Sequence, residues 1–241
     1  MKKLFVVWQD PETRMWYPVG LLSLEREGYR YVYTHGATLS NRFTPFGRMD
    51  DLHKAYESEN LFPLFTNRLL SKDRPEYKDY LSWLNLDSEN FGPFEEFERT
   101  AGIRATDSIV LVPFPEPQSD GTYGLRFFSN GIRYLPQEAQ NWVKKLETGE
   151  RLFLMLDNQN EKDPSAIAMR TEPVMVVGYV PRYYTQDIRQ LLDTKASDSL
   201  MVYVEKVNKN APSQFKLLCT LQAKWPDNFR PCSGDLFTPL A

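Results

Sequence analysis

Three short motifs between Gly131 and Leu191 hold the side chains whose types and spacing point most clearly to chemistry. In chain order they are Gly131-Ile132-Arg133-Tyr134, then Asp157-Asn158-Gln159-Asn160-Glu161-Lys162-Asp163-Pro164-Ser165-Ala166-Ile167, then Val177-Gly178-Tyr179-Val180-Pro181-Arg182. An aromatic ring offers a stacking platform for bases, and an arginine pairs with phosphate through its planar fork. A carboxylate accepts a hydrogen bond from a hydroxyl group but repels a phosphate. These are the side-chain types that a nucleotide-binding surface uses.

Enzymatic motifs are missing from the sequence. It contains no glycine-rich dinucleotide loop, no Walker loop, no zinc-protease helix motif and no kinase catalytic loop. Two histidines, His35 and His53, leave little material for histidine-based acid–base chemistry, and Cys219 and Cys232 form neither a disulfide framework nor a zinc site. We therefore expect a protein that is not an enzyme and that uses no metal or other cofactor.

The charge balance excludes a protein that coats duplex DNA. Residues 1–118 carry 14 basic and 18 acidic side chains, and residues 119–241 carry 15 and 14, which gives −4 and +1 within a formal net charge of −3. Extensive phosphate contact normally goes with a clear basic excess, so any contact with nucleic acid is expected to be local, as at a strand end. The longest apolar runs are far shorter than the roughly 18 residues of a membrane span. We expect a cytoplasmic protein with no membrane partner.

The proline-rich stretch from Pro113 to Gly121 predicts a boundary between two domains, residues 1–118 and 119–241. Alternating apolar residues predict an antiparallel meander in the first domain, and proline followed by apolar residues at helical spacing predicts two short helices. The expected strands are residues 3–8, 16–23, 29–34 and 109–113, and the expected helices are residues 74–84 and 92–101. The sequence thus predicts an α+β protein that is mostly β.

In the second domain, strands are expected at residues 151–156, 166–170 and 214–221, with helices at 136–148 and 183–193. A simpler interpretation of the motif residues stays open beside the nucleotide-binding one. In it, Gly131 and Gly178 serve backbone geometry alone, and Asp157 with Asn160 forms an ordinary polar turn between two strands. Phe215 is an equal candidate for a pocket wall and for the core, because it alternates with Leu217.

The three motifs together resemble a HIRAN domain over about residues 122–225. That resemblance implies an OB-like β-barrel with two helices, a module that grips the 3′ end of single-stranded DNA in DNA-remodelling and repair proteins. It places Arg133 and Tyr134 in the nucleotide pocket, Asn160 and Asp163 at the terminal 3′-hydroxyl, and Arg182 on a phosphate. Lys162 stands where DNA-binding members carry a stacking aromatic residue, and Phe215 is a candidate for the opposite wall of the pocket.

Residues 3–112 resemble the amino-terminal subdomain of HipA-type kinases. The resemblance lies in Val19-Gly20-Leu21-Leu22, Tyr29 to Tyr33, and the block Pro63-Leu64-Phe65-Thr66-Asn67-Arg68-Leu69-Leu70. In that family the subdomain carries no catalytic residue, packs on the kinase core and, as a separate protein in split systems, acts as an antitoxin. The resemblance implies a HipA-like kinase core as partner, contacted through Phe65, Asn67 and Arg68.

Two hypotheses of different classes follow. The first is a non-catalytic, antitoxin-like protein that restrains a separate HipA-type kinase and carries a HIRAN domain for nucleic-acid contact. The alternative is an accessory factor of DNA repair or replication that binds 3′ ends of single-stranded DNA. In the alternative, the first domain is a structural platform.

Overall fold

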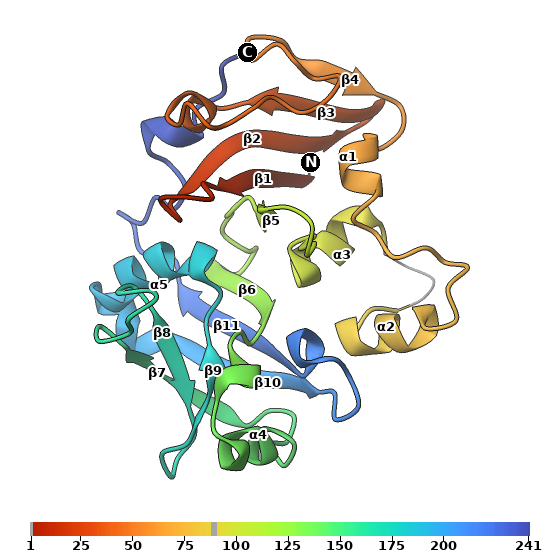
Figure 1. The fold of residues 1–241 in the computed structure, drawn as a ribbon. Coiled ribbons are helices and arrows are strands. Elements are labelled where there is room, and N and C mark those ends of the chain that lie inside the picture. The colour runs from red at the N-terminus through yellow and green to blue at the C-terminus, as the bar shows by residue number, and fades with distance from the viewer. Residues whose placement is uncertain (1, 88–90) are drawn as a thin grey trace. The chain divides into compact units, whose positions relative to one another are not determined.

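The computed structural model describes residues 2–87 and 91–241, without the side chains of residues 195 and 196. The chain forms two compact units, each with its own β-sheet (Figure 1). Unit 1 consists of Met1–Tyr77, Ser88–Pro115 and Arg230–Ala241, and unit 2 of Lys78–Asp87 and Glu116–Phe229. The predicted fold class, a mostly β, α+β protein with two domains, is confirmed.

The main boundary between the units lies between Pro115 and Glu116, inside the predicted linker. Neither unit is one continuous piece of chain. Two segments lie in a different unit from the one that the predicted boundary at residue 118 assigns to them. Lys78–Asp87, which holds most of a helix expected in the first domain, lies in unit 2, and the C-terminal Arg230–Ala241 lies in unit 1. Hence a single cut at residue 118 separates neither unit cleanly.

Unit 1 is built on a five-stranded antiparallel sheet in the order β4-β3-β2-β1-β5. The strands are β1 (Lys2–Gln9), β2 (Trp16–Glu25), β3 (Gly28–Tyr33), β4 (Tyr56–Ser58) and β5 (Ile109–Pro113). The first three strands follow one another across the sheet as the predicted meander, β4, which the sequence did not predict, continues it beyond β3, and β5 returns to the free edge of β1. Two short helices, α1 (Pro63–Thr66) and α3 (Pro93–Thr100), and the 3-10 turn η1 (His35–Thr38) complete this part.

The core of unit 1 is aromatic and aliphatic. Its fully buried members include Leu4, Val6, Leu22, Tyr31 and Tyr33. The C-terminal segment, with the 3-10 turn η6 (Asp235–Phe237), returns to the same sheet: the N–H of Leu240 donates to the carbonyl of Tyr33 over 2.9 Å. Unit 1 therefore depends on residues from both ends of the chain.

Unit 2 is a curled six-stranded sheet in the order β6-β11-β10-β7-β8-β9. The strands are β6 (Thr122–Phe128), β7 (Arg151–Leu156), β8 (Ile167–Arg170), β9 (Val176–Tyr179), β10 (Met201–Val207) and β11 (Leu217–Lys224). Two hydrogen bonds of 2.8 Å join the backbones of Asn130, just past β6, and Tyr179 at the end of β9. This isolated bridge links the ends of the first and last strands of the order, and the sheet curls into a half-barrel.

Three helices pack on the half-barrel: α2 (Tyr77–Leu84), α4 (Gln137–Val143) and α5 (Thr185–Leu192). The α5 helix buries Ile188 and Leu191, in agreement with their spacing of three residues. The 3-10 turns are η2 (Ile132–Tyr134), η3 (Arg182–Tyr184), η4 (Lys195–Ser199) and η5 (Ser213–Phe215). Within the described residues, no helix has the length and apolar character needed to cross a membrane.

Candidate functional site

The aromatic ring of Tyr134 stands exposed on unit 2, with two cations over it. Gly131 has a φ of 78°, a left-handed conformation that glycine adopts without strain, and it starts the tight turn η2 that carries Tyr134. Tyr134 is 69% exposed. Cζ of Arg133 lies 4.5 Å and Nζ of Lys162 lies 5.2 Å from the centroid of its ring, and the Arg133 guanidinium also donates to the Tyr134 hydroxyl. Two segments of the chain that are distant in sequence thus meet at one ring.

The loop between β7 and β8 takes its shape from Asn160. Its Oδ1 accepts hydrogen bonds from the backbone N–H groups of Lys162 and Asp163, both at 3.1 Å, and its Nδ2 donates to Oδ2 of Asp157 at 3.0 Å. A side-chain amide that holds the backbone two and three residues further on is the usual device of an Asx-type turn. Asn160 therefore positions Lys162 and Asp163 and is itself half-buried.

Asp163 is tied to the third motif through an ion pair. Its Oδ2 lies 3.3 Å from Nε of Arg182, which begins η3, and its Oδ1 accepts the N–H of Ser165 at 3.0 Å. The carboxylate side chain is 17% exposed and the guanidinium 35%. Both groups are thus partly open to solvent, so a ligand can reach either, and each moderates the charge of the other.

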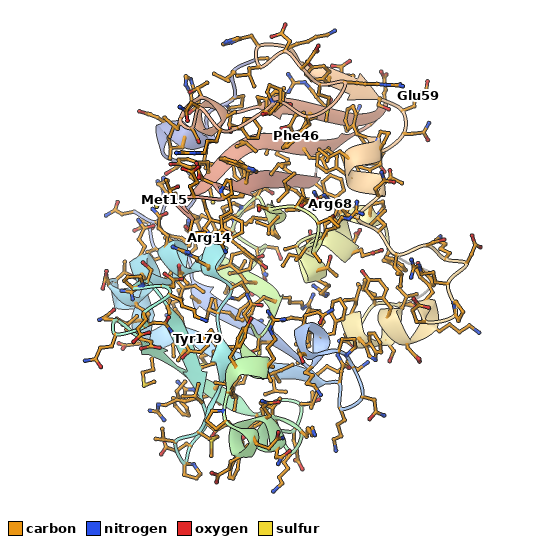
Figure 2. All side chains as sticks on the ribbon, viewed as in Figure 1. Arg14, Met15, Phe46, Glu59, Arg68 and Tyr179 are labelled. Carbon is orange, nitrogen blue, oxygen red and sulfur yellow. The ribbon has the colours of Figure 1, made fainter. Side chains whose placement is uncertain are left out.

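Tyr179, labelled in Figure 2, connects the first two of these motifs. Its hydroxyl donates to Oδ2 of Asp157 at 3.1 Å, and a Cβ on Gly131 would come within 3.1 Å of its ring. Burial, followed by the Asp157 contact, raises the pKa of Tyr179. The preceding Gly178 has a φ of 136°, and a Cβ there would lie 1.9 Å from Oγ of Ser129. Sequence reasoning did not select Tyr179, although it lies inside the third motif.

Phe215 belongs to the packing beneath the site. It ends the 3-10 turn η5 and does not lie in the expected strand, which begins two residues later at Leu217. Nδ2 of Asn208 donates to the Phe215 carbonyl at 2.7 Å, which removes that carbonyl from strand pairing. The ring packs against those of Tyr80, Trp83 and Phe128, with centroids 5.2–6.0 Å apart. Because η5 lies against η2, Phe215 supports the turn that bears Tyr134.

The three residues expected to contact a kinase lie in unit 1, and two of them are buried. Phe65 is fully buried in the core. The Arg68 side chain, labelled in Figure 2, is also completely buried: it donates to the carbonyl of Gly102 at 2.8 Å and pairs with Asp107 at 2.7 Å. Asn67 alone of the three is exposed. Phe65 and Arg68 thus stabilise unit 1 in this structure.

Across the described part of the chain, no group of three or more His, Cys, Asp or Glu side chains is placed to hold a metal ion. What the fold and the site define is a curled β-sheet whose Asn130–Tyr179 bridge lies next to the turn that carries an exposed aromatic ring with two cations over it. Residues 123–225 of the chain match the family model of the HIRAN domain. Unit 2 therefore carries a HIRAN domain, as the three motifs predict.

Two solved structures are similar to part of this chain. A protein from Lactobacillus plantarum is 21% identical, with a TM-score of 0.33, over 43% of this chain and 97% of that one. The HIRAN domain of human HLTF is 18% identical, with a TM-score of 0.36, over 50% of this chain and 93% of that one. No curated protein matches this chain. The HipA-type resemblance of residues 3–112 stays a prediction.

Proposed function

We propose that unit 2 binds single-stranded DNA and that the protein acts as a non-catalytic accessory factor of DNA repair or replication. The HIRAN match supports binding of nucleic acid. The observation that carries the proposal furthest is the convergence of Arg133 and Lys162 on the exposed ring of Tyr134. A base that displaces these cations can stack on the ring, and the displaced cations can pair with its phosphate.

The same geometry suggests how the site selects a free 3′ terminus. The Asp163 side chain is partly exposed and lies beside Arg182. A carboxylate accepts a hydrogen bond from a terminal 3′-hydroxyl but repels a 3′-phosphate. Arg182 beside it supplies a donor for the phosphate on the 5′ side of the last nucleotide. In this proposal the Asp163–Arg182 pair recognises the end, and Tyr134 stacks on a base.

A small number of phosphate contacts agrees with the charge of the protein. Residues 119–241 have a formal charge of +1, so there is no broad basic surface to bind many phosphates. The cations at the site are Arg133, Lys162 and Arg182, of which Arg182 is already paired with Asp163. We therefore expect weak binding that depends on the strand end.

The test is fluorescence anisotropy of the full chain with three oligonucleotides of one sequence: linear with a 3′-hydroxyl, linear with a 3′-phosphate, and circular. Affinities are compared at one stated salt concentration, since salt changes all of them. The 3′-hydroxyl strand is expected to bind most tightly. Equal binding to all three would rule out end recognition, and no binding to any of them would overturn the proposed function.

The kinase-docking hypothesis for unit 1 rests on the resemblance of residues 63–70 alone. Burial of Phe65 and Arg68 leaves Asn67 as the exposed member of the three selected residues. No contact in the described part of unit 1 favours a kinase over another partner. We keep this hypothesis as a prediction, tested by co-purification of the full chain with a HipA-like kinase core.

A further inference from the structure

A second candidate site lies on unit 2 at the start of β7. There a pocket of about 190 Å³ is lined by side chains from β7, β8, α5, η4 and β10. β7 pairs with β10 only through Arg151 and Leu152, opposite Tyr203 and Val202, and then pairs with β8 alone. The pocket includes residues on both sides of this divergence. Its apolar lining residues include Leu192 and Leu200.

Two arginines that lie over one phenylalanine ring form the charged side of this pocket. Cζ of Arg151 lies 4.9 Å and Cζ of Arg170 lies 5.1 Å from the centroid of the Phe153 ring. A guanidinium that lies over an aromatic ring is held in place and still presents its N–H groups at its edge. Such an edge matches the geometry of a phosphate, which accepts two parallel hydrogen bonds from it.

The charges around the pocket leave one arginine without a carboxylate partner. Arg170 is 3.0 Å from Glu172, whose side chain is 67% exposed. Arg151 is exposed and makes no ion pair with any described carboxylate. Among the residues that line the pocket, Arg151 and Arg170 are the charged ones, and both are cations. A ligand with an anionic part and a flat, largely apolar part fits both sides of the pocket, and a nucleotide has both.

This pocket and the Tyr134 site lie on the same face of the sheet. Directly paired residues of antiparallel strands point to the same face, so Met155, Ala168 and Tyr179 form one row across it. Phe153 and Arg170 form the next row, about 7 Å further along β7, and Arg151 begins a third. Measured along the strands from the row of Met155, Ala168 and Tyr179, Arg170 is thus about 7 Å away and Arg151 roughly 13 Å away.

We propose that the Arg151–Phe153–Arg170 pocket is a second contact for the DNA strand, which holds a nucleotide on the 5′ side of the terminal site through its phosphate. This inference rests on the proposed function and extends it: the strand end binds at Tyr134 and Asp163, and the chain continues over β8 and β7 to the arginines. OB-type folds contact about 4 to 16 nucleotides, so a second contact lies within the ordinary range.

Binding of unlabelled oligonucleotides of two and eight nucleotides to the full chain, measured by competition, tests the proposal. In the double variant Arg151→Met, Arg170→Met the apolar stems still cover Phe153 while both charges are removed. The matched control, Lys144→Met, Lys145→Met, removes two charges from exposed residues at the end of α4. The single variant Arg151→Met serves if the double variant unfolds, since Arg151 is exposed.

The wild-type chain is expected to bind eight nucleotides more tightly than two. The double arginine variant should bind two nucleotides as the wild type does but eight nucleotides about tenfold more weakly. Its slope of log K against log salt should be shallower by roughly 0.7 for each phosphate that the variant no longer neutralises. The lysine control should keep the length dependence.

Two results would overturn this inference alone: equal wild-type affinity for both lengths, or an arginine variant that keeps its preference for eight nucleotides. The inference would also be overturned if the wild type bound a free nucleoside monophosphate and the double arginine variant did not, while this variant bound the eight-nucleotide strand as the wild type does. The pocket would then serve a free nucleotide. Failure of the wild type to bind any oligonucleotide would instead remove the proposed function, and this inference with it.

Discussion

The hydroxyl of Tyr179 and the carboxylate of Asp157 are 3.1 Å apart and join the end of β9 to the loop after β7. The same Oδ2 of Asp157 accepts Nδ2 of Asn160, so one oxygen links the strand to the residue that shapes the loop. The turn at Gly131 lies on the other side of the tyrosine ring. Tyr179 is thus a positioning residue, because it contacts both the turn that carries Tyr134 and the loop that carries Asp163.

Removal of the Tyr134 ring should weaken binding to every single-stranded end. Tyr134→Leu removes the stacking face, and we expect a loss of about 1–3 kcal/mol for 3′-hydroxyl and 3′-phosphate strands alike. Tyr134→Phe keeps the ring and removes only the hydroxyl that Arg133 contacts, so it should bind nearly as the wild type does. Anisotropy titrations compare the two variants. Equal losses in both would show that the ring does not stack.

Replacement of Asp163 by asparagine should change selectivity more than affinity. An asparagine side chain at this position can still accept the N–H of Ser165, which keeps the loop in place, but it carries no charge to repel a 3′-phosphate or to pair with Arg182. We expect Asp163→Asn to narrow the ratio of affinities for 3′-hydroxyl and 3′-phosphate strands, measured by anisotropy. An unchanged ratio would remove Asp163 from end recognition.

Lys162 should limit stacking on Tyr134. Its ammonium group lies over the ring, where a base has to displace it. Lys162→Tyr supplies a flat face in place of a cation, so we expect tighter binding of the 3′-hydroxyl strand together with a weaker dependence on salt. Titrations at two salt concentrations measure both effects. Weaker binding with unchanged salt dependence would contradict this account.

Arg68 should matter for the stability of unit 1. Arg68→Met leaves the Gly102 carbonyl and the Asp107 carboxylate without their donor, and we expect the free energy of unfolding to fall by about 3 kcal/mol. Arg74→Met breaks an exposed pair with Glu76 and should cost less than about 1 kcal/mol. Urea unfolding of both variants gives the comparison. Equal small losses would show that the buried pair contributes little.

Asp10 should make unit 1 sensitive to acid. Burial alone would raise the pKa of this carboxyl, but hydrogen bonds from Ser40 and the backbone of Thr13 and Glu12, with Arg42 nearby, lower it to about 2. An unfolded aspartate has a pKa of about 3.9. The stabilisation is therefore present above about pH 4 and disappears as the pH falls towards 2.

The Asp10→Asn variant isolates this effect. Because its side chain does not titrate, the urea midpoint of its unfolding should fall less between about pH 4.5 and about pH 2.5 than that of the wild type. Identical changes in the two proteins would assign the acid sensitivity to other carboxylates.

Local sequence patterns were enough to predict most of unit 1. Alternation of apolar residues located β1, β2, β3 and β5 to within about two residues, and proline at the first turn located α3. The exchange of segments between the units was not predictable in the same way. It depends on contacts such as that of Trp83 with Phe215, which are distant in sequence and which no local pattern marks.

For the candidate site, the sequence predicted which residues belong to it but not the contacts between them. The motifs selected Tyr134, Asp163 and Arg182, and the structure brings all three segments together around Tyr179. The ammonium of Lys162 over the Tyr134 ring depends on the path of the Asn160 turn. Likewise, the stacking of Arg151 and Arg170 on Phe153 follows from the register of β7 and β8. Neither arrangement can be read from spacing along the chain.

The return of the C-terminal residues to unit 1 sets an order for folding during synthesis. A chain leaves the ribosome from its N-terminus, and domains generally fold as units when their last segment emerges. All of unit 2 lies before Arg230, whereas the sheet of unit 1 gains its partner at Leu240 only afterwards. Unit 1 thus cannot be completed until all of unit 2 has been translated, although most of its strands are translated first.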